Sequence, residues 1–425
     1  MTGSALDSPV QARRAIEALR AGVPNRDAVL ALGSAHPQIE EQFGRLLAEA
    51  KEQPTAPRSP AGFLIAGNFG TGKSHELEYL QQIALREGFV ASKIVISKET
   101  PLYDPVKVYR AAIQAAAVPG RVGAALAQIA GELRFDDPRY LDFYRWVQGP
   151  TAALNQRFAA TLFLFERSRH DPELRDRIIS FWGGDPIQVG EIRARLKDLG
   201  QRVTYPIERA GVRALAYQRF RFVAQLMVAA GYAGWLLLFD EVDLIARYTL
   251  NQRAKSYAEI ARWTGNLKEE TTPGLSSVLA ITSAFEAEVI DGRNDREAVP
   301  GKIQLSGNEA DRLLAGPAER GMKLIGRALR LAPPDAATID DTYAKVRAIH
   351  GRAYGWDPPP ADHRGERLAS TRMREYVRRW INEWDLKRLY PGYEPELEAT
   401  TVDLHYDEDA AFESPAEPDA GDSLG

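Results

Sequence analysis

One octapeptide constrains this chain more than any other feature. It reads Gly67-Asn68-Phe69-Gly70-Thr71-Gly72-Lys73-Ser74 and fits the pattern G-x-x-x-x-G-K-[ST]. Its glycines let the backbone curl so that successive N–H groups point at one anion. Lys73 brings a cation to the same anion, and Ser74 offers a hydroxyl to a divalent metal ion. The octapeptide therefore predicts a loop that binds a chain of phosphates.

The segments on either side of this loop fit a parallel α/β sheet. The short apolar run Gly62–Ala66 precedes the loop, as a buried parallel strand would. After the loop, Leu77, Leu80 and Ala84 recur at helical spacing, and Phe89–Ser97 has the composition of another strand. Strand, loop, helix and strand in this order open a doubly wound sheet. The helix would present its positive N-terminal end to the phosphates.

Two acids follow the most apolar strand of the chain. Trp235–Phe239 predicts a buried strand, and Asp240 and Glu241 come directly after it. Because parallel strands end at one edge of a sheet, both acids are expected near the phosphate loop. There Asp240 would hold Mg²⁺ through its water shell. Glu241 would orient and polarise an attacking water. Asp243 is expected to cap a helix or to hydrogen-bond locally.

Further candidates lie after the next predicted strand, Ser277–Thr282. A hydroxyl of Thr282 or Ser283 would sense the terminal phosphate or hold the water. The alternative is a strand-end hydroxyl that satisfies backbone groups. Arg293 and Arg296 follow in a polar loop, where either would act as an arginine finger toward a neighbouring subunit of a homo-oligomer. The alternative for both is a solvated surface arginine.

An amphipathic helix is predicted over Thr371–Leu386. Its apolar face includes two tryptophans, which at this spacing favour a core over a platform that stacks bases: Met373, Tyr376, Val377, Trp380, Ile381 and Trp384. Arginines occupy other positions: Arg372, Arg374, Arg378 and Arg379. Arg372, in the first turn, is the preferred candidate for a contact with the terminal phosphate. Basic residues between Arg364 and Arg388 are also candidates for DNA binding, with a solvated face as the alternative.

Composition narrows the class of protein. The chain of 425 residues has no cysteine, which excludes disulfides, thiolate metal sites and a cysteine nucleophile. The six histidines are scattered, so Mg²⁺ is the only metal expected. His75 follows the phosphate loop and is expected to pack there or to support it. No apolar run approaches the ~20 residues that span a bilayer, and the N-terminus lacks the apolar core of a signal peptide. A cytoplasmic protein is expected.

Four regions are expected along the chain. Residues 1–52 form an N-terminal helical segment, and residues 53–300 form the core with a helical insertion over about 106–230. Residues 301–395 form a C-terminal helical domain. Residues 396–425 form an acidic tail that is expected to be disordered. The tail contains no Lys or Arg, and its acids outweigh the net charge of −4. The remainder is therefore mildly basic, which permits contact with nucleic acid.

Several segments resemble the BrxD-type ATP-binding proteins of bacterial BREX phage-defence loci. They are the phosphate loop with His75, Ser97–Pro105, Leu238–Ile245, Gln252–Glu259, Gly22–Asn25 and Asn294–Arg296. The resemblance implies a P-loop ATPase core similar to the AAA+ class, with a helical insertion before the Asp240 strand. It implies that four residues bind ATP and Mg²⁺: Lys73, Ser74, Asp240 and Glu241. It also makes Thr282 a candidate phosphate sensor, and it implies a role in phage defence beside a methyltransferase and other locus proteins.

The leading interpretation is an ATPase whose hydrolysis cycle remodels a partner protein or a DNA complex. The alternative is a slow nucleotide switch whose ATP-bound form docks a partner or DNA with little turnover. Glu241 favours the hydrolase, because a switch needs no residue that polarises water. A small-molecule kinase fits less well, since the Asp240-Glu241 pair and the large helical parts suit a mechanical ATPase.

Overall fold

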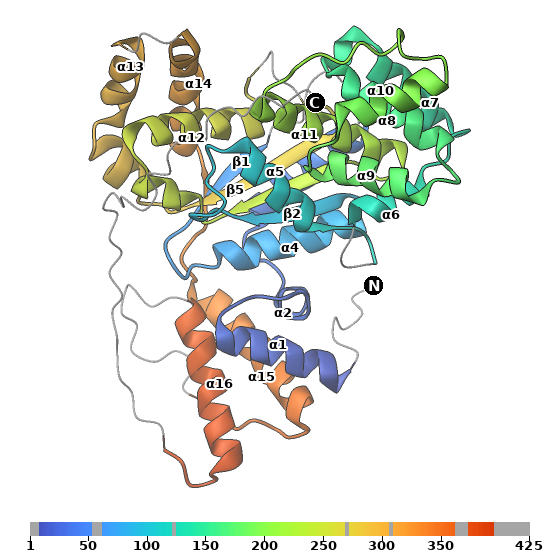
Figure 1. The fold of residues 1–425 in the computed structure, drawn as a ribbon. Helices are drawn as coiled ribbons and strands as arrows, with labels where there is room; N and C mark the ends of the chain where they lie inside the picture. The colour runs from blue at the N-terminus through green and yellow to red at the C-terminus, as the bar shows by residue number, and fades with distance from the viewer. Residues whose placement is uncertain are drawn as a thin grey trace.

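The protein is built on a mostly parallel six-stranded sheet with helices on both faces (Figure 1). The structure is a computed structural model that describes residues 8–52, 62–120, 125–267, 272–305, 309–361 and 373–394. The strands are β1 (Phe63–Ala66), β2 (Val90–Val95), β3 (Ala116–Ala117), β4 (Trp235–Asp240), β5 (Leu275–Ile281) and β6 (Leu329–Arg330). Their order is β3-β2-β4-β5-β1-β6, and only β3 pairs antiparallel with its neighbour. The predicted α/β class with a parallel sheet is confirmed.

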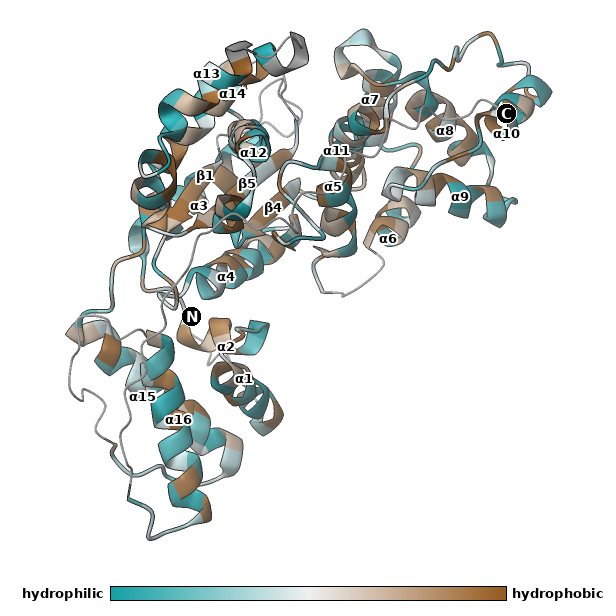
Figure 2. Ribbon diagram, turned by 60° about the vertical axis from the view of Figure 1, so that its left-hand side comes forward, coloured by the Kyte–Doolittle hydropathy of each residue, from teal (hydrophilic) through white to brown (hydrophobic). Residues whose placement is uncertain are grey.

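Helices cover both faces of the sheet, and this explains why its strands are apolar throughout. Leu236 and Leu238 of β4 pack in one core, whereas Leu237 and Phe239 pack in the other. The first core is closed by α3 (Pro37–Glu52) and α4 (Lys73–Arg86). The second is closed by α5 (Pro105–Gln114), α11 (Val212–Ala229) and α12 (Leu250–Trp263). Figure 2 shows the hydrophobic strands between these helices.

The stretch between the second predicted strand and the acidic strand is helical, apart from the short β3. It forms a lobe beside the sheet (upper right in Figure 1). The lobe comprises α6 (Ala125–Glu132), α7 (Pro138–Gln148), the 3₁₀ turn Pro150–Ala152, α8 (Gln156–Arg167), α9 (Pro172–Gly183) and α10 (Val189–Asp198). Aromatic side chains fill it, with Trp182 against Phe165 and Phe222. Because this core is continuous with that of the sheet, the lobe is anchored to the rest of the molecule.

A helical pair follows β5 and packs on α12. It consists of α13 (Asp295–Leu305) and α14 (Glu309–Ile325). Gly321 allows the close approach of α14, since a Cβ there would lie 1.8 Å from the Tyr257 carbonyl oxygen. The buried Asp295 accepts hydrogen bonds from Arg253 Nε at 2.8 Å and from Tyr257 Oη at 2.7 Å. These contacts fix the start of α13 to α12.

The two ends of the described chain come together in a second lobe (bottom of Figure 1). It contains α1 (Pro9–Ala21), α2 (Arg26–Leu32), α15 (Ala336–Tyr354) and α16 (Met373–Leu389). Trp380 and Trp384 are fully buried in its core, which confirms the core interpretation of these tryptophans. Arg20 of α1 donates to Asp385 of α16 at 2.5 Å. We call α1, α2, α15 and α16 the terminal lobe.

Two expectations of the sequence concern parts of the chain that the structure leaves out. Arg372 and the acidic tail 396–425 lie outside the described residues. Among the residues that are described, no helix is long and apolar enough to cross a membrane.

Candidate functional site

The glycine-rich loop connects the end of β1 to the start of α4. Gly67 N–H donates to the Ile281 carbonyl at 3.1 Å, which ties the loop to the end of β5. Gly70 and Gly72 have φ values of 79° and 105°, a region that favours glycine. A Cβ on Gly67 would lie 2.5 Å from Thr71 Oγ1. No side chain caps the N-terminus of α4, so its first N–H groups are free to bind an anion.

Lys73 is buried beneath this loop. Its ammonium donates to the Gly67 carbonyl at 2.9 Å, which places the cation inside the curl of the loop. A buried ammonium requires such an acceptor, and phosphate oxygens would form stronger, charge-assisted bonds. Ser74 follows in the first turn of α4, and Asn68 accepts from both the N–H and the hydroxyl of Thr71 through its carbonyl.

The two predicted acids end β4 at the same edge of the sheet. Asp240 is buried and accepts a hydrogen bond from the Glu241 N–H at 3.0 Å. Glu241 has a φ of 58°, which turns the chain sharply into the 3₁₀ segment Val242–Arg247. Between β4 and β1 lies β5, and the buried Thr282 follows it directly. The ends of three adjacent strands thus carry the loop, Thr282 and the acids.

Charges of both signs act on these acids. Burial raises the pKa of Glu241, and the charges of Asp243 and Asp240 raise it further, whereas Lys73 and Arg374 lower it. Burial also raises the pKa of Asp243, with Lys73 acting against the shift. Asp243 does not cap the 3₁₀ segment, because Glu241 occupies the N-cap position. Its buried Oδ1 has no hydrogen-bond partner among the described residues.

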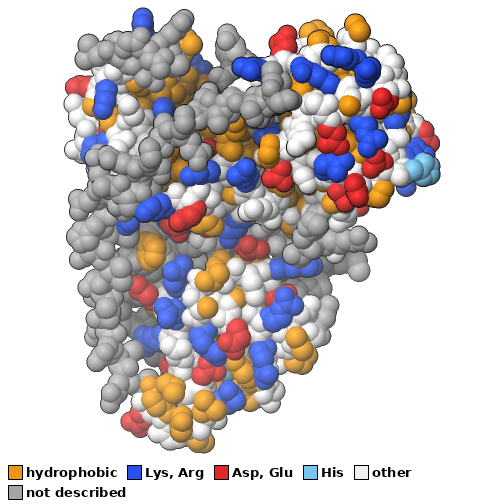
Figure 3. Space-filling model, viewed as in Figure 1, with side chains coloured by type: hydrophobic (Ala, Val, Ile, Leu, Met, Phe, Trp, Pro, Cys, Tyr) orange, Lys and Arg blue, Asp and Glu red, His pale blue; other side chains and the backbone are white. Residues whose placement is uncertain are grey.

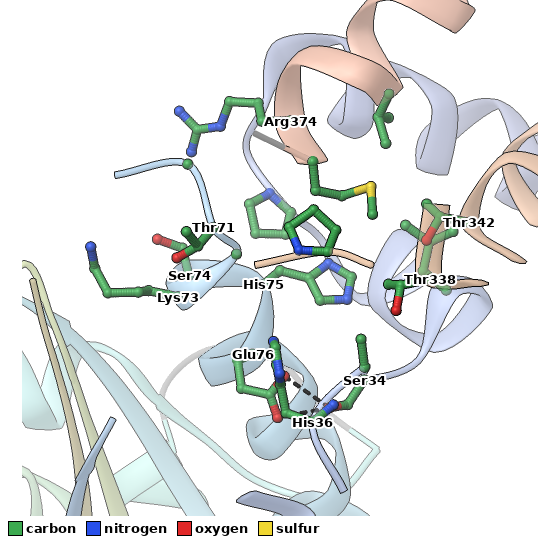
Figure 4. A pocket seen from close by; sticks show the side chains of 18 of the residues that line it. Ser34, His36, Thr71, Lys73, Ser74, His75, Glu76, Thr338, Thr342 and Arg374 are labelled. Atoms are coloured by element: carbon green, nitrogen blue, oxygen red, sulfur yellow. Dashed lines mark hydrogen bonds between the residues drawn. The ribbon is translucent and has the colours of Figure 1, made fainter. Parts of the chain in front are cut away.

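A cavity of about 600 Å³ extends from the loop to the terminal lobe (Figure 4). Ligand pockets of drug-sized molecules span about 300–1,000 Å³. Thr338 and Thr342 of α15 lie across the cavity from the loop, and Arg374 reaches over the loop from α16. The wall includes residues 69–76 together with Leu19, Gly22, Leu32, Ser34, His36, Glu241, Asp341 and Met373.

Arg374 is a site residue that the sequence interpretation passed over in favour of Arg372. Its guanidinium lies 5.5 Å from the centroid of the Phe69 ring. Both arginines belong to the predicted basic helix, but helical spacing alone does not show which one faces a loop from another part of the chain. Arg374 lines the cavity, whereas Arg372 lies outside the described residues.

The loop before α3 also joins the site, which no sequence pattern indicated. His75 Nε2 lies 2.8 Å from the Gly33 carbonyl, and burial lowers the pKa of this histidine. Ser34 Oγ lies 3.0 and 2.9 Å from the two carboxyl oxygens of Glu76 (Figure 4). The sequence feature that could have indicated this contact is a carboxylate, Glu76, on the buried face of an amphipathic helix. The His75 contact thus links the start of α4 to the residue that ends α2 in the terminal lobe.

The two finger candidates lie away from the cavity. Arg296 donates to Asp291 at 2.7 Å and to Glu286 at 2.6 Å. Neither Arg296 nor Arg293 belongs to the described residues that line the cavity. A role for them would therefore involve the site of another copy of the chain.

The fold and the site define an α/β protein with a glycine-rich loop at the carboxyl edge of a mostly parallel sheet. The model of the family described as BREX system ATP-binding protein BrxC/D matches residues 8–133 and 154–383. The chain belongs to this family, as the resemblance of its motifs predicts. Neither a curated protein nor a solved structure matches the chain significantly.

The buried Glu76 makes the stability of the protein depend on pH. Burial raises its pKa to about 7 from an ordinary value of 4.5, although the Ser34 hydrogen bond lowers it. The folded protein therefore holds this proton more tightly than the unfolded chain. Its contribution to the free energy of unfolding is greatest below pH 4.5, falls as the pH rises to about 7, and is constant above that.

Glu76→Gln removes this titration. When the pH is raised from about 5 to about 8, the free energy of unfolding of the variant should rise by roughly 1–3 kcal/mol relative to that of wild type. Urea unfolding of both proteins at the two pH values measures the difference. Glu49→Gln is the matched control, since Glu49 is exposed on α3. Equal pH dependence in wild type and Glu76→Gln would contradict this account.

Proposed function

We propose that this protein binds and hydrolyses Mg·ATP at the carboxyl edge of its sheet. One observation carries the proposal: the phosphate loop after β1 and the acids after β4 flank the end of β5, so one triphosphate could touch both. Open α/β sheets bind ligands at this edge. The description of the family as ATP-binding favours adenine as the base.

The loop residues would hold the triphosphate. Backbone N–H groups of residues 67–74 and the N-terminus of α4 supply donors and a positive partial charge. The Lys73 ammonium would exchange the Gly67 carbonyl for oxygens of the β- and γ-phosphates. Arg374, above Phe69, would meet the terminal phosphate from the side of the terminal lobe.

Four further residues would serve the reaction itself. Ser74 and Asp240 would hold Mg²⁺. Mg²⁺ would supply neutralisation of the charge that develops on the phosphates. Glu241 would orient and polarise the attacking water, and Thr282 would hold that water or sense the γ-phosphate.

The arrangement supports an AAA+-like P-loop ATPase. The phosphate-loop strand and the acidic strand are separated by one strand, and a helical lobe stands over the loop. The base would lie toward that lobe, between the Gly33–His36 segment and Thr338 of α15. Closure of the lobe would then depend on the nucleotide.

Arg296 or Arg293 would complete the site of a neighbouring subunit in an oligomer. If so, Arg296→Ala or Arg293→Ala should lower turnover by about a thousandfold or more and leave ATP binding unchanged. Mixing the deficient variant with Lys73→Ala should restore activity in part, because the Lys73→Ala subunit still donates its arginine. Steady-state ATPase assays measure both effects. Unchanged turnover in both arginine variants would rule out the trans finger.

The biological role would be remodelling of a protein or DNA complex in phage defence, with other BREX proteins as partners. On the face shown in Figure 3, Lys and Arg of the terminal lobe are interspersed with Asp and Glu. A DNA contact there would involve few phosphates, so its affinity would fall only moderately as the salt concentration rises.

Phosphate release from Mg·ATP, with and without duplex and single-stranded DNA, tests the function. We expect turnover that DNA or a rising protein concentration stimulates. Tight ATP retention with almost no turnover would instead favour the slow switch that docks a partner. Failure to retain DNA at low salt with ATP present would count against direct DNA binding.

A further inference from the structure

Three separate parts of the chain meet at the side chain of Arg374. It leaves the first turn of α16, and its guanidinium lies over the Phe69 ring of the phosphate loop. On the way, its stem crosses Gly22, the residue that ends α1. A Cβ on Gly22 would lie 3.3 Å from Arg374 Cδ and 3.4 Å from Nε. Figure 4 shows Arg374 extended from the lobe toward the loop.

We propose that Phe69 and Gly22 are positioning residues that hold Arg374 over the phosphate loop and so set the preference for ATP over ADP. Phe69 supplies an aromatic face for the guanidinium, and Gly22 leaves room for the stem. The inference rests on the proposed function, because it takes Arg374 as the contact for the γ-phosphate.

The loop pattern itself does not require an aromatic residue at this position. Phosphates are bound through backbone N–H groups and through Lys73, and the third residue of the pattern is free. A guanidinium within about 6 Å of a ring centroid is attracted to the ring face. The Phe69 side chain is therefore available for a task that phosphate binding does not assign to it, and the contact at 5.5 Å defines that task.

Gly22 constrains the same side chain from the other side. Its φ of 72° lies in the left-handed region, and its N–H closes the end of α1. Gly355 has the same position at the end of α15, with a φ of 67°, but nothing lies within 4 Å of a Cβ built there. Both glycines belong to the terminal lobe, so an alanine at either one introduces similar strain. Only the alanine at Gly22 also crowds Arg374.

The position of Arg374 matters because ADP lacks the group that it would contact. Holding the guanidinium in place before the nucleotide binds reduces the ordering cost of binding ATP. The same contact contributes little to the binding of ADP. Loss of Phe69 should therefore weaken binding of the triphosphate and leave binding of the diphosphate nearly unchanged.

The test measures dissociation constants of Mg·ADP and of the β,γ-imido analogue of ATP for the full chain. In wild type, the analogue should bind more tightly than ADP. Phe69→Leu should reduce that preference by about threefold to tenfold, whereas Phe69→Tyr, which keeps the ring, should change it less than about twofold. Gly22→Ala should reduce it as well, and Gly355→Ala should not. Thermal unfolding confirms that each variant is folded.

A double-mutant cycle separates positioning from a merely structural effect. In an Arg374→Ala background, Phe69→Leu should cause no further loss of preference, because its effect acts through the arginine. Equal weakening of ADP and the analogue by Phe69→Leu, or additive losses in the double variant, would overturn the inference alone. If wild type bound neither nucleotide, the proposed function would fail and this inference with it.

Discussion

Glu241→Gln should leave ATP bound and slow its hydrolysis by about a hundredfold to ten-thousandfold, the usual contribution of a general base. The amide retains the shape of the side chain and its hydrogen bonds to water, but it cannot accept a proton. Other residues, among them Lys73, would bind the phosphates, so the affinity of the variant for ATP should be preserved. Single-turnover hydrolysis and nucleotide titration together separate the chemical step from binding.

Asp243→Asn is the matched control for that experiment. It removes a carboxylate two residues along the chain, where burial and neighbouring charges act in the same way. Since Asp243 is not assigned to the water, the loss of turnover should be much smaller. A loss equal to that of Glu241→Gln would shift the role of the base to Asp243 or spread it over both acids.

Lys73→Ala should weaken the binding of ATP. Charged hydrogen bonds contribute about 1.5–3 kcal/mol each, so removal of the ammonium should weaken affinity about tenfold to a hundredfold and reduce turnover with it. Lys51→Ala removes the same charge from the surface, where Lys51 pairs with Glu87, and should change neither. Equilibrium titration with Mg·ATP measures all three proteins. Equal affinity in wild type and Lys73→Ala would mean that the nucleotide does not bind at the loop.

Local sequence was sufficient for the parts of the fold that depend on one segment. The strands β1, β4 and β5 were predicted because a run of apolar residues with no polar alternation fits only a strand buried on both faces. The loop was predicted from its glycines, and two of them, Gly70 and Gly72, have φ values that exclude most side chains. The strands β3 and β6 were missed because two residues leave no periodic pattern.

Contacts between distant segments could not be predicted in the same way. The apolar faces of α1 and α16 were recognisable, but an amphipathic pattern does not show which element an apolar face packs against. The bond from Arg20 to Asp385 joins residues 365 positions apart. For the same reason, the sequence did not show that Arg374 lines the cavity, and Arg372, its preferred candidate, lies outside the described residues. The Ser34–Glu76 contact was missed on the same grounds.

The most direct test of the account is a structure of the Glu241→Gln protein with Mg·ATP. The account predicts one triphosphate in the curl of residues 67–74, bonded to Lys73, with the metal between Ser74 and the water shell of Asp240. A nucleotide bound elsewhere, or a Lys73 and an Asp240 that reach different ligands, would contradict it.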